Sequence, residues 1–222
     1  MGLDGGKGID FLATKLYNCS EKGVKMNTDR FIDQIVRDRN GYLRVIDVCN
    51  NGVPKWAVME YVARNAMEKV APGVYASQEN WGDRLYLLQL RNRNIIFSHE
   101  TALYIHNLSD REPFSPVVSV ARGYNAKHLR DAGVIVHTVR TEWVEMGLSE
   151  AKTFEGNTIR VYDKERCLCD AIKGKERMDI QVFQKAVTGY FSDRQRNIHK
   201  LMDYAETMGI ADKVRGYAEV LL

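Results

Sequence analysis

Residues 28–77 read TDRFIDQIVRDRNGYLRVIDVCNNGVPKWAVMEYVARNAMEKVAPGVYAS, and this stretch decides the fold of the N-terminal third of the chain. Its first apolar side chains recur with i, i+3, i+4 spacing, which predicts a helix that begins at Asn27 or Thr28. Asn40-Gly41 ends that helix, because glycine accepts the left-handed conformation. Residues 42–49 are then predicted to form a second short helix, and the asparagines and glycine at 50–52 a tight turn.

Pro54 suits the first position of a third helix, where its missing N–H costs little. This helix is predicted to run to about Arg64 or Asn65, with an inward face made of Ala57, Val58, Tyr61 and Val62. Short strands at 67–70 and 73–76 follow, joined by a turn through Pro72 and Gly73. Three helices followed by a β-hairpin predict a winged helix-turn-helix, whose third helix usually enters the major groove of DNA.

Basic and aromatic side chains on the outer surface of this segment are the candidate DNA contacts. Arg and Lys bind guanine edges and phosphates, and an exposed aromatic ring can contact bases or sugars. Helical spacing turns the side chains at positions 55, 56, 60 and 64 outward, and Lys69 lies on the hairpin. The predicted DNA-binding residues are therefore Arg44, Lys55, Trp56, Arg64 and Lys69.

Length and composition limit the classes of protein to which this chain can belong. A chain of 222 residues holds one large domain or two smaller ones, and its net charge of +3 is far below that of a nonspecific nucleic-acid coat. No apolar run is long enough to suggest a membrane span, and no signal peptide is visible, so a cytoplasmic location is expected. Cys167-Leu168-Cys169 is an isolated C-x-C without a second ligand pair, which favours structural thiols over a metal site. No metal and no cofactor are expected.

The remaining sequence predicts an α+β fold. We expect a leader at 1–26, the winged helix-turn-helix at 27–80, and a mixed α/β C-terminal domain at 81–222 with a small sheet and terminal helices. Strands are predicted at 116–121, 134–139 and 158–161. A helix entered through Asp163 follows the last strand, and Ser192 with Gln195 predicts a capping box that opens a later helix.

Further basic clusters lie outside the N-terminal segment, at residues 127–130, 173–177 and 194–200. The last two are candidates to extend a phosphate-binding surface. The alternative is that each cluster belongs to a solvated helix face, and the sequence favours this alternative for each cluster separately.

Three stretches resemble the AbiEi-type antitoxins of bacterial abortive-infection, type IV toxin–antitoxin systems. They are the hairpin KVAPGVYAS (69–77), the segment IIFSHETALYIHNLSD (95–110), and VIVHTV…IRVYDKERCLCDAI (134–172), which contains an R-x-x-x-D helix (Arg166, Asp170). The resemblance implies a winged helix that binds inverted repeats in its own promoter and represses the operon. It also implies a C-terminal domain that opposes a nucleotidyltransferase-like toxin without necessarily forming a stable complex.

Two other groups of residues suggest a metal site or a nuclease site. His99 and His106 are seven residues apart, which is a long separation for ligands of one metal. Asp131 with Glu150 and Lys152 faintly resembles the D…E-x-K site of restriction-type nucleases, but that chemistry needs E-x-K on a strand, and Ser149 looks like a helix cap. No catalytic residue is therefore predicted. A ligand-responsive winged-helix regulator remains the main alternative to the antitoxin.

Overall fold

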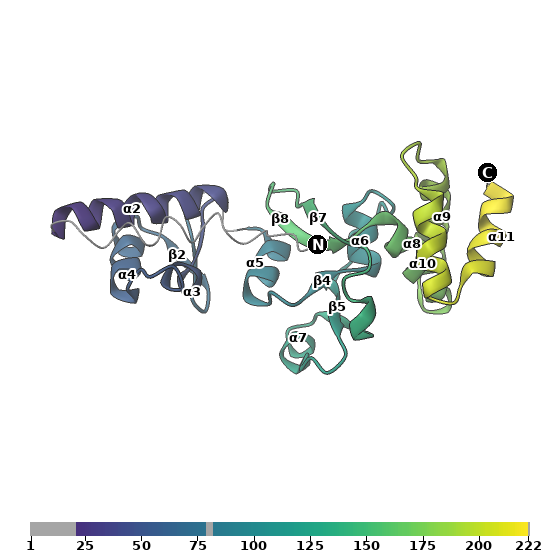
Figure 1. Cartoon of the computed structure of the whole chain (residues 1–222), viewed down its shortest axis with the longest axis horizontal. Coiled ribbons are helices and arrows are strands. Elements are labelled where there is room, and N and C mark those ends of the chain that lie inside the picture. The colour runs from purple at the N-terminus through teal and green to yellow at the C-terminus, as the bar shows by residue number, and fades with distance from the viewer. Residues whose placement is uncertain (1–20, 79–81, 222) are drawn as a thin grey trace, which may run out of the picture. The chain divides into compact units, whose positions relative to one another are not determined.

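The computed structural model describes residues 21–78 and 82–221, with side chains from Thr28 onward (Figure 1). It has the expected α+β composition. The described residues form two compact units, one of residues 21–91 with 155–157 and one of residues 92–154 with 158–221. The predicted leader lies largely outside the described residues. The first helix begins at Glu21 rather than at Asn27 or Thr28, so the predicted cap lies within the helix.

In the segment predicted to be a winged helix-turn-helix, the first unit contains three helices and two strands that were expected and one strand that was not. One further helix follows this segment. In chain order they are α2 (Glu21–Asp38), β1 (Tyr42–Arg44), α3 (Val45–Cys49), α4 (Lys55–Arg64), β2 (Glu68–Ala71), β3 (Val74–Ala76) and α5 (Arg84–Arg91). The strands form an antiparallel sheet in the order β1-β3-β2.

The single helix predicted over residues 42–49 is wrong. Residues 42–44 form β1, which pairs with β3, and only residues 45–49 are helical. Tyr42 and Leu43 are both buried, so side chains on both faces of β1 are covered. Pairing with a distant strand therefore outweighs the local helical pattern.

A compact apolar core holds α4 in place. The predicted inward residues Val58, Tyr61 and Val62 are buried, whereas Ala57 is half-buried. The Tyr61 hydroxyl donates to Asp33 Oδ1 on α2 at 2.5 Å, and burial raises the pKa of Tyr61. The core consists of Ile32, Leu43, Val45, Val48, Val58, Tyr61, Val62 and Met67.

The second unit is a five-stranded mixed sheet with helices. Its elements are β4 (Ile96–Phe97), α6 (His99–Ile105), β5 (Val117–Ala121), α7 (Lys127–Asp131), β6 (Ile135–Val139), β7 (Leu148–Lys152), β8 (Thr158–Tyr162), α8 (Lys164–Lys173), α9 (Ile180–Ser192), α10 (Ile198–Thr207) and α11 (Ala211–Leu221), with 3-10 turns η1 (Thr141–Trp143) and η2 (Lys175–Arg177). The strand order is β6-β5-β4-β8-β7, and β4 and β8, like β5 and β6, run parallel. The three predicted strands of this region are confirmed as β5, β6 and β8.

Two local predictions in this unit are wrong. Ser149 lies inside β7 and does not cap a helix, because residues 148–152 pair with β8 in a regular antiparallel register. Ser192 ends α9 instead of opening a helix; the cap of α10 is Asn197, whose side chain accepts from the Lys200 N–H at 3.0 Å. The prediction that a helix begins after Asp163 is confirmed. Asp163 is the N-cap of α8, and its carboxylate accepts from the Arg166 N–H.

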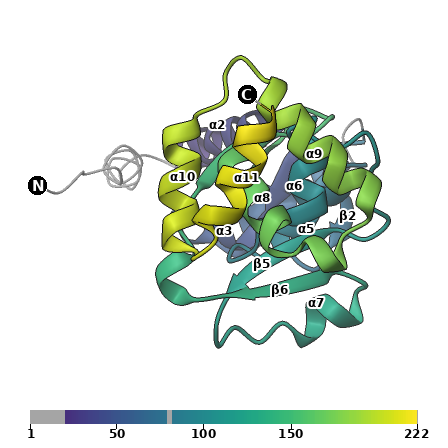
Figure 2. The same ribbon diagram turned by 90° about the vertical axis from the view of Figure 1, so that its right-hand side faces the viewer.

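Helix α8 is the centre of this unit. It contacts α6, α9 and α10, and Figure 2 shows it with α9, α10 and α11 grouped around it. Every side chain from Glu165 to Ile172 is buried. None of the helices in the described part of the chain combines the length and apolarity that crossing a bilayer requires.

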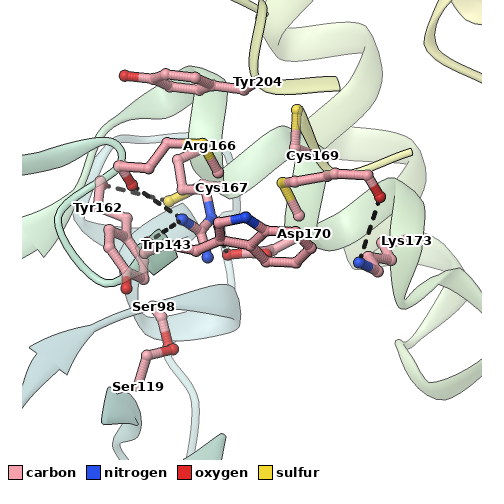
Figure 3. Close-up of polar contacts among 12 residues, drawn as sticks. Ser98, Ser119, Trp143, Tyr162, Arg166, Cys167, Cys169, Asp170, Lys173 and Tyr204 are labelled. Carbon is pink, nitrogen blue, oxygen red and sulfur yellow. Dashed lines mark hydrogen bonds and ion pairs between the residues drawn. The ribbon is translucent and has the colours of Figure 1, made fainter. Parts of the chain in front are cut away.

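The guanidinium of Arg166, only 1% exposed, fastens α8 to the chain segment before β7 (Figure 3). Its Nη1 donates to the carbonyls of Trp143 and Met146, both at 2.9 Å, and its Nε donates to Asp170 Oδ2 at 3.1 Å. The guanidinium also lies 4.4 Å from the ring centroid of Tyr162. Gly147 has φ +77°, and a Cβ there would meet Arg166 Cβ at 2.5 Å. Arg166 and Asp170, the R-x-x-x-D pair, therefore have a structural role, and we call this pair the latch.

A second buried polar contact joins α6 to β6. The ring of His99 stacks on that of His137 with centroids 3.7 Å apart. Burial, reinforced by His137, lowers the pKa of His99 to about 3, and burial also lowers the pKa of His106. Both rings are therefore neutral in the folded unit near neutral pH.

The latch makes a mutational prediction. Arg166→Ala should lower the free energy of unfolding by about 3–5 kcal/mol, because it leaves the buried Asp170 carboxylate without its partner. Lys164→Ala on the same helix is the control: its ion pair with Asp193, at 2.6 Å, is partly exposed and should contribute only about 0–1 kcal/mol. Urea unfolding followed by circular dichroism measures both. Similar losses for the two variants would contradict the latch.

The buried histidines predict acid sensitivity. The unfolded chain binds protons near pH 6.5, whereas His99 in the fold binds one only near pH 3, so stability is complete above about pH 6.5 and falls below it. Between about pH 6.5 and 5 this amounts to roughly 2 kcal/mol for His99. His99→Asn should flatten the pH dependence, and asparagine tolerates the φ of +47° found there. His199→Asn, at an exposed site, should leave the dependence as in the parent chain. An unchanged slope in the His99 variant would refute this account.

Candidate nucleic-acid interface

A tight turn sets the direction in which α4 leaves α3. The Gly52 N–H donates to the Cys49 carbonyl at 3.0 Å, and Gly52 has φ +86°, a conformation that favours glycine. Pro54, with φ −62° and ψ 141°, is the cap residue before the helix, which starts at Lys55, so it lies one position before the first helical position predicted for it. The first turn of α4 therefore lies close to the end of α3.

An open hollow of about 460 Å³ lies between the starts of α3 and α4 and the β2–β3 hairpin. Three of the five predicted DNA-binding residues line it, namely Arg44, Lys55 and Lys69. No acidic residue is among those that line it, so its charge is of one sign. A concave surface of one charge sign concentrates the opposite charge near it. The lining residues are Arg44, Val45, Ile46, Cys49, Lys55, Met59, Lys69, Pro72, Gly73 and Tyr75.

The three cations of the hollow differ in their partners. Arg44 lies 3.3 Å from Asp47, a buried carboxylate that also accepts from Arg39 at 2.6 Å. Asp47 is therefore shared by two arginines and only partly offsets their charge. Neither Lys55 nor Lys69 has a carboxylate oxygen within 4.0 Å among the side chains described from Thr28 on. These two lysines are the least compensated charges of the hollow.

The other two predicted contacts lie outside the hollow. Trp56 is 69% exposed on α4 but does not line it. Arg64 is the last residue of α4, and its Nη2 lies 2.7 Å from Asp29 Oδ1 on α2. The hydrogen bond to Asp29 raises the pKa of Arg64. Arg64 thus takes part in the contact between α2 and α4.

Sequence reasoning missed the apolar wall of the hollow. Ile46, Cys49, Met59 and Tyr75 belong to α3, α4 and β3, and Ile46 is 51% exposed although it is a large apolar side chain. Its exposure beside Arg44 could not be read from the sequence, because residues 42–49 were assigned to one helix with several apolar faces.

The nuclease-like residues do not come together. Glu150 and Lys152 do lie on a strand, β7, contrary to the argument that placed them after a helix cap. However, β7 forms one edge of the sheet, and Asp131 ends α7, which packs against β6 at the other edge. Lys152 Nζ instead donates to Thr158 Oγ1 at 2.7 Å. Within residues 21–78 and 82–221, no group of three or more His, Cys, Asp or Glu residues is arranged to hold a metal.

His99 and His106 do not form one site either. The His106 ring bonds to the Tyr162 carbonyl at 2.7 Å, whereas His99 stacks on His137. Ser98, which precedes α6, makes no side-chain cap; its Oγ accepts from Ser119 Oγ at 2.9 Å.

The C-x-C thiols are structural. The Sγ atoms of Cys167 and Cys169 donate to the carbonyls of Tyr162 and Leu201. Burial raises the pKa of Cys169 to about 12 and that of Cys167 well above its usual range. Both thiols therefore stay protonated, which does not suit metal binding.

Comparisons with known proteins identify no family for this chain. No protein-family model matches it, and no curated protein matches it. A solved structure, the crystal structure of RV2827C protein from Mycobacterium tuberculosis, is similar with a TM-score of 0.43 and 10% sequence identity, over 86% of this chain and 80% of that one. A likeness at this level assigns neither fold nor function.

Cys49 provides a chemical probe of the hollow. It is half-buried and lines the hollow, whereas Cys167 and Cys169 are buried. In a Cys19→Ser chain, where the remaining cysteine outside the described residues is removed, a maleimide should modify Cys49 in the folded protein and the other two only after unfolding. Mass spectrometry of the modified peptides measures this. Modification of Cys167 or Cys169 at the rate of Cys49 would contradict the placement.

Proposed function

We propose that this chain is a DNA-binding antitoxin that represses its own promoter. The observation that carries the DNA-binding half is the acid-free hollow, which gathers Lys55 of α4, Lys69 of the hairpin and Arg44 of β1. A surface that gathers positive charge without acidic neighbours fits a phosphate backbone.

The element order supports this proposal. Winged helices follow the order helix, strand, helix, helix, strand, strand, and the first unit has this order from α2 to β3. By that analogy α4 would enter the major groove from its first turn, where Lys55 and the exposed Trp56 lie. Lys69 and Arg44 would then contact backbone phosphates beside the groove.

The modest net charge bears on how DNA would be bound. With a net charge of +3, one copy offers few phosphate contacts, and affinity for phosphates rises with the number of contacts. Two copies on an inverted repeat would double that number. We therefore propose an operator made of paired half-sites.

The antitoxin half rests on the resemblance of residues 95–110. In the structure this stretch forms β4 and α6, and Ile95, Ile96, Phe97 and Leu103 are fully buried. Many of the residues that carry the resemblance are therefore core residues of this unit. We propose that the surface opposing a nucleotidyltransferase-like toxin lies on exposed residues of the second unit.

Promoter binding tests the repressor half. Lys55→Ala should weaken binding to the chain's own promoter by about 1–3 kcal/mol if Lys55 contacts a base, and Lys69→Ala should weaken binding similarly to all sequences. Arg64→Ala should lower stability more than affinity, because Asp29 already pairs with it. Lys152→Ala on β7 is the control. Gel shifts in which both lysine variants bind like the parent chain would exclude the hollow as the interface.

Co-expression tests the antitoxin half. When an adjacent nucleotidyltransferase-like gene is expressed, growth should stop, and co-expression of this chain should restore it. The Lys55→Ala, Lys69→Ala double variant, supplied from an independent promoter, should still restore growth, since the two functions lie in different units. Failure of the parent chain to restore growth would leave a transcription regulator as the better proposal.

A further inference from the structure

Two arginines lie side by side at one edge of the sheet in the second unit. Strands β5 and β6 are parallel, and their last residues, Ala121 and Val139, are register partners. Each strand is followed at once by an arginine, Arg122 and Arg140. The Arg122 N–H donates to the Val139 carbonyl at 2.8 Å, so the pairing continues into these residues. Arg122 and Arg140 therefore follow neighbouring strand ends and start from adjacent backbone positions.

A third cation, Lys173, meets Arg140 at the ring of Trp143. The Arg140 guanidinium and the Lys173 ammonium each lie 4.8 Å from the ring centroid of Trp143. Figure 3 shows Lys173, at the end of α8, beside this indole. Lys173 Nζ also donates to the Met208 carbonyl at 3.4 Å. The indole thus holds two cations near the start of η1, and we call Arg122, Arg140, Trp143 and Lys173 the indole patch.

The three cations of the indole patch have no acidic partner, unlike several other cations of the same unit. Lys164, Lys185 and Lys200 each have a carboxylate oxygen within 3.0 Å. Across the side chains described in the structure, no carboxylate lies within 4.0 Å of Arg122, Arg140 or Lys173, although all three are exposed. The exposed η2 turn follows Lys173 closely, and its Lys175, Glu176 and Arg177 together add one net positive charge.

We propose that the indole patch binds backbone phosphates of a nucleic acid, which would make the second unit a nucleic-acid-binding surface separate from the hollow of the first. Arginine presents a fork of donors that matches two phosphate oxygens, and lysine supplies a point charge. Bound phosphates neutralise the adjacent arginines, and the indole holds Arg140 and Lys173 in place through cation–π contacts. Contacts to backbone phosphates do not distinguish one base from another. The surface therefore binds nucleic acids of any sequence whose backbone geometry fits it.

The test uses the full chain in which the hollow has been weakened by Lys55→Gln and Lys69→Gln. Fluorescence anisotropy follows its binding to labelled duplex DNA, duplex RNA and single-stranded RNA of about 20 nucleotides over a range of salt concentrations. We expect residual, salt-sensitive binding to at least one of the three probes. The probe that binds best shows which of these backbones, duplex DNA, duplex RNA or single-stranded RNA, the indole patch prefers. Adding Arg122→Gln, Arg140→Gln and Lys173→Gln should weaken this binding about tenfold or more and reduce the slope of log K against log salt by about 2–3.

Controls separate charge loss from misfolding. Lys152→Gln, an exposed lysine on the opposite edge strand, should leave affinity unchanged. Trp143→Phe should keep most of the binding because it keeps an aromatic ring, and the triple variant should keep the parent's thermal midpoint because its three side chains are exposed.

Two outcomes distinguish this inference from the proposed function. If the triple substitution leaves affinity and salt slope unchanged for every probe, the indole patch does not bind nucleic acid. If the lysine substitutions in the hollow have no effect while the triple substitution abolishes binding, the interface proposed for the first unit is wrong and the indole patch stands.

Discussion

The pairing of β1 with β3 is the constraint on which the candidate interface depends. β1 is three residues long, yet it sets Arg44 opposite Val74, and the next residue, Val45, donates its N–H to the Gly73 carbonyl at 2.9 Å. The start of α3 is thereby fixed to the turn of the hairpin. Because the apolar core holds α4 against α3, the cations of β1, α4 and β2 come to line one hollow. Without this pairing, Arg44 would be an isolated cation on a helix.

Much of the fold follows from local signals in the sequence. Proline at the entry of α4, glycine in the hairpin turn, Asp163 before α8 and the apolar runs of β5 and β6 each act over a few residues, and each was predicted. β1 and β7 could not be predicted in this way. β1 depends on a partner strand 30–34 residues away. β7 is an edge strand whose side chains Glu150 and Lys152 are exposed, so it lacks apolar alternation.

The candidate site was predictable as a set of residue types but not as an arrangement. Lys55 and Lys69 could be named from helical spacing and hairpin position. That Arg64 pairs with Asp29, and that Ile46 and Tyr75 form an apolar wall, depend on how separate elements pack. In the second unit, the residues that carry the family resemblance are mostly core, and the latch of Arg166 and Asp170 is buried. Of the exposed charges of the indole patch, Lys173 belongs to the basic cluster at 173–177 that the sequence marks, whereas Arg122 and Arg140 lie outside every such cluster.

Protection of Cys49 by DNA tests the central claim most directly, because this thiol lies within the hollow. In the Cys19→Ser chain, the rate of maleimide modification of Cys49 is measured with and without the chain's own promoter, and with unrelated DNA of equal length. DNA docked on the hollow should slow modification several-fold with the promoter, and far less with the unrelated DNA. An unchanged rate, while gel shifts show the promoter fully bound, would contradict the claim and move the interface elsewhere.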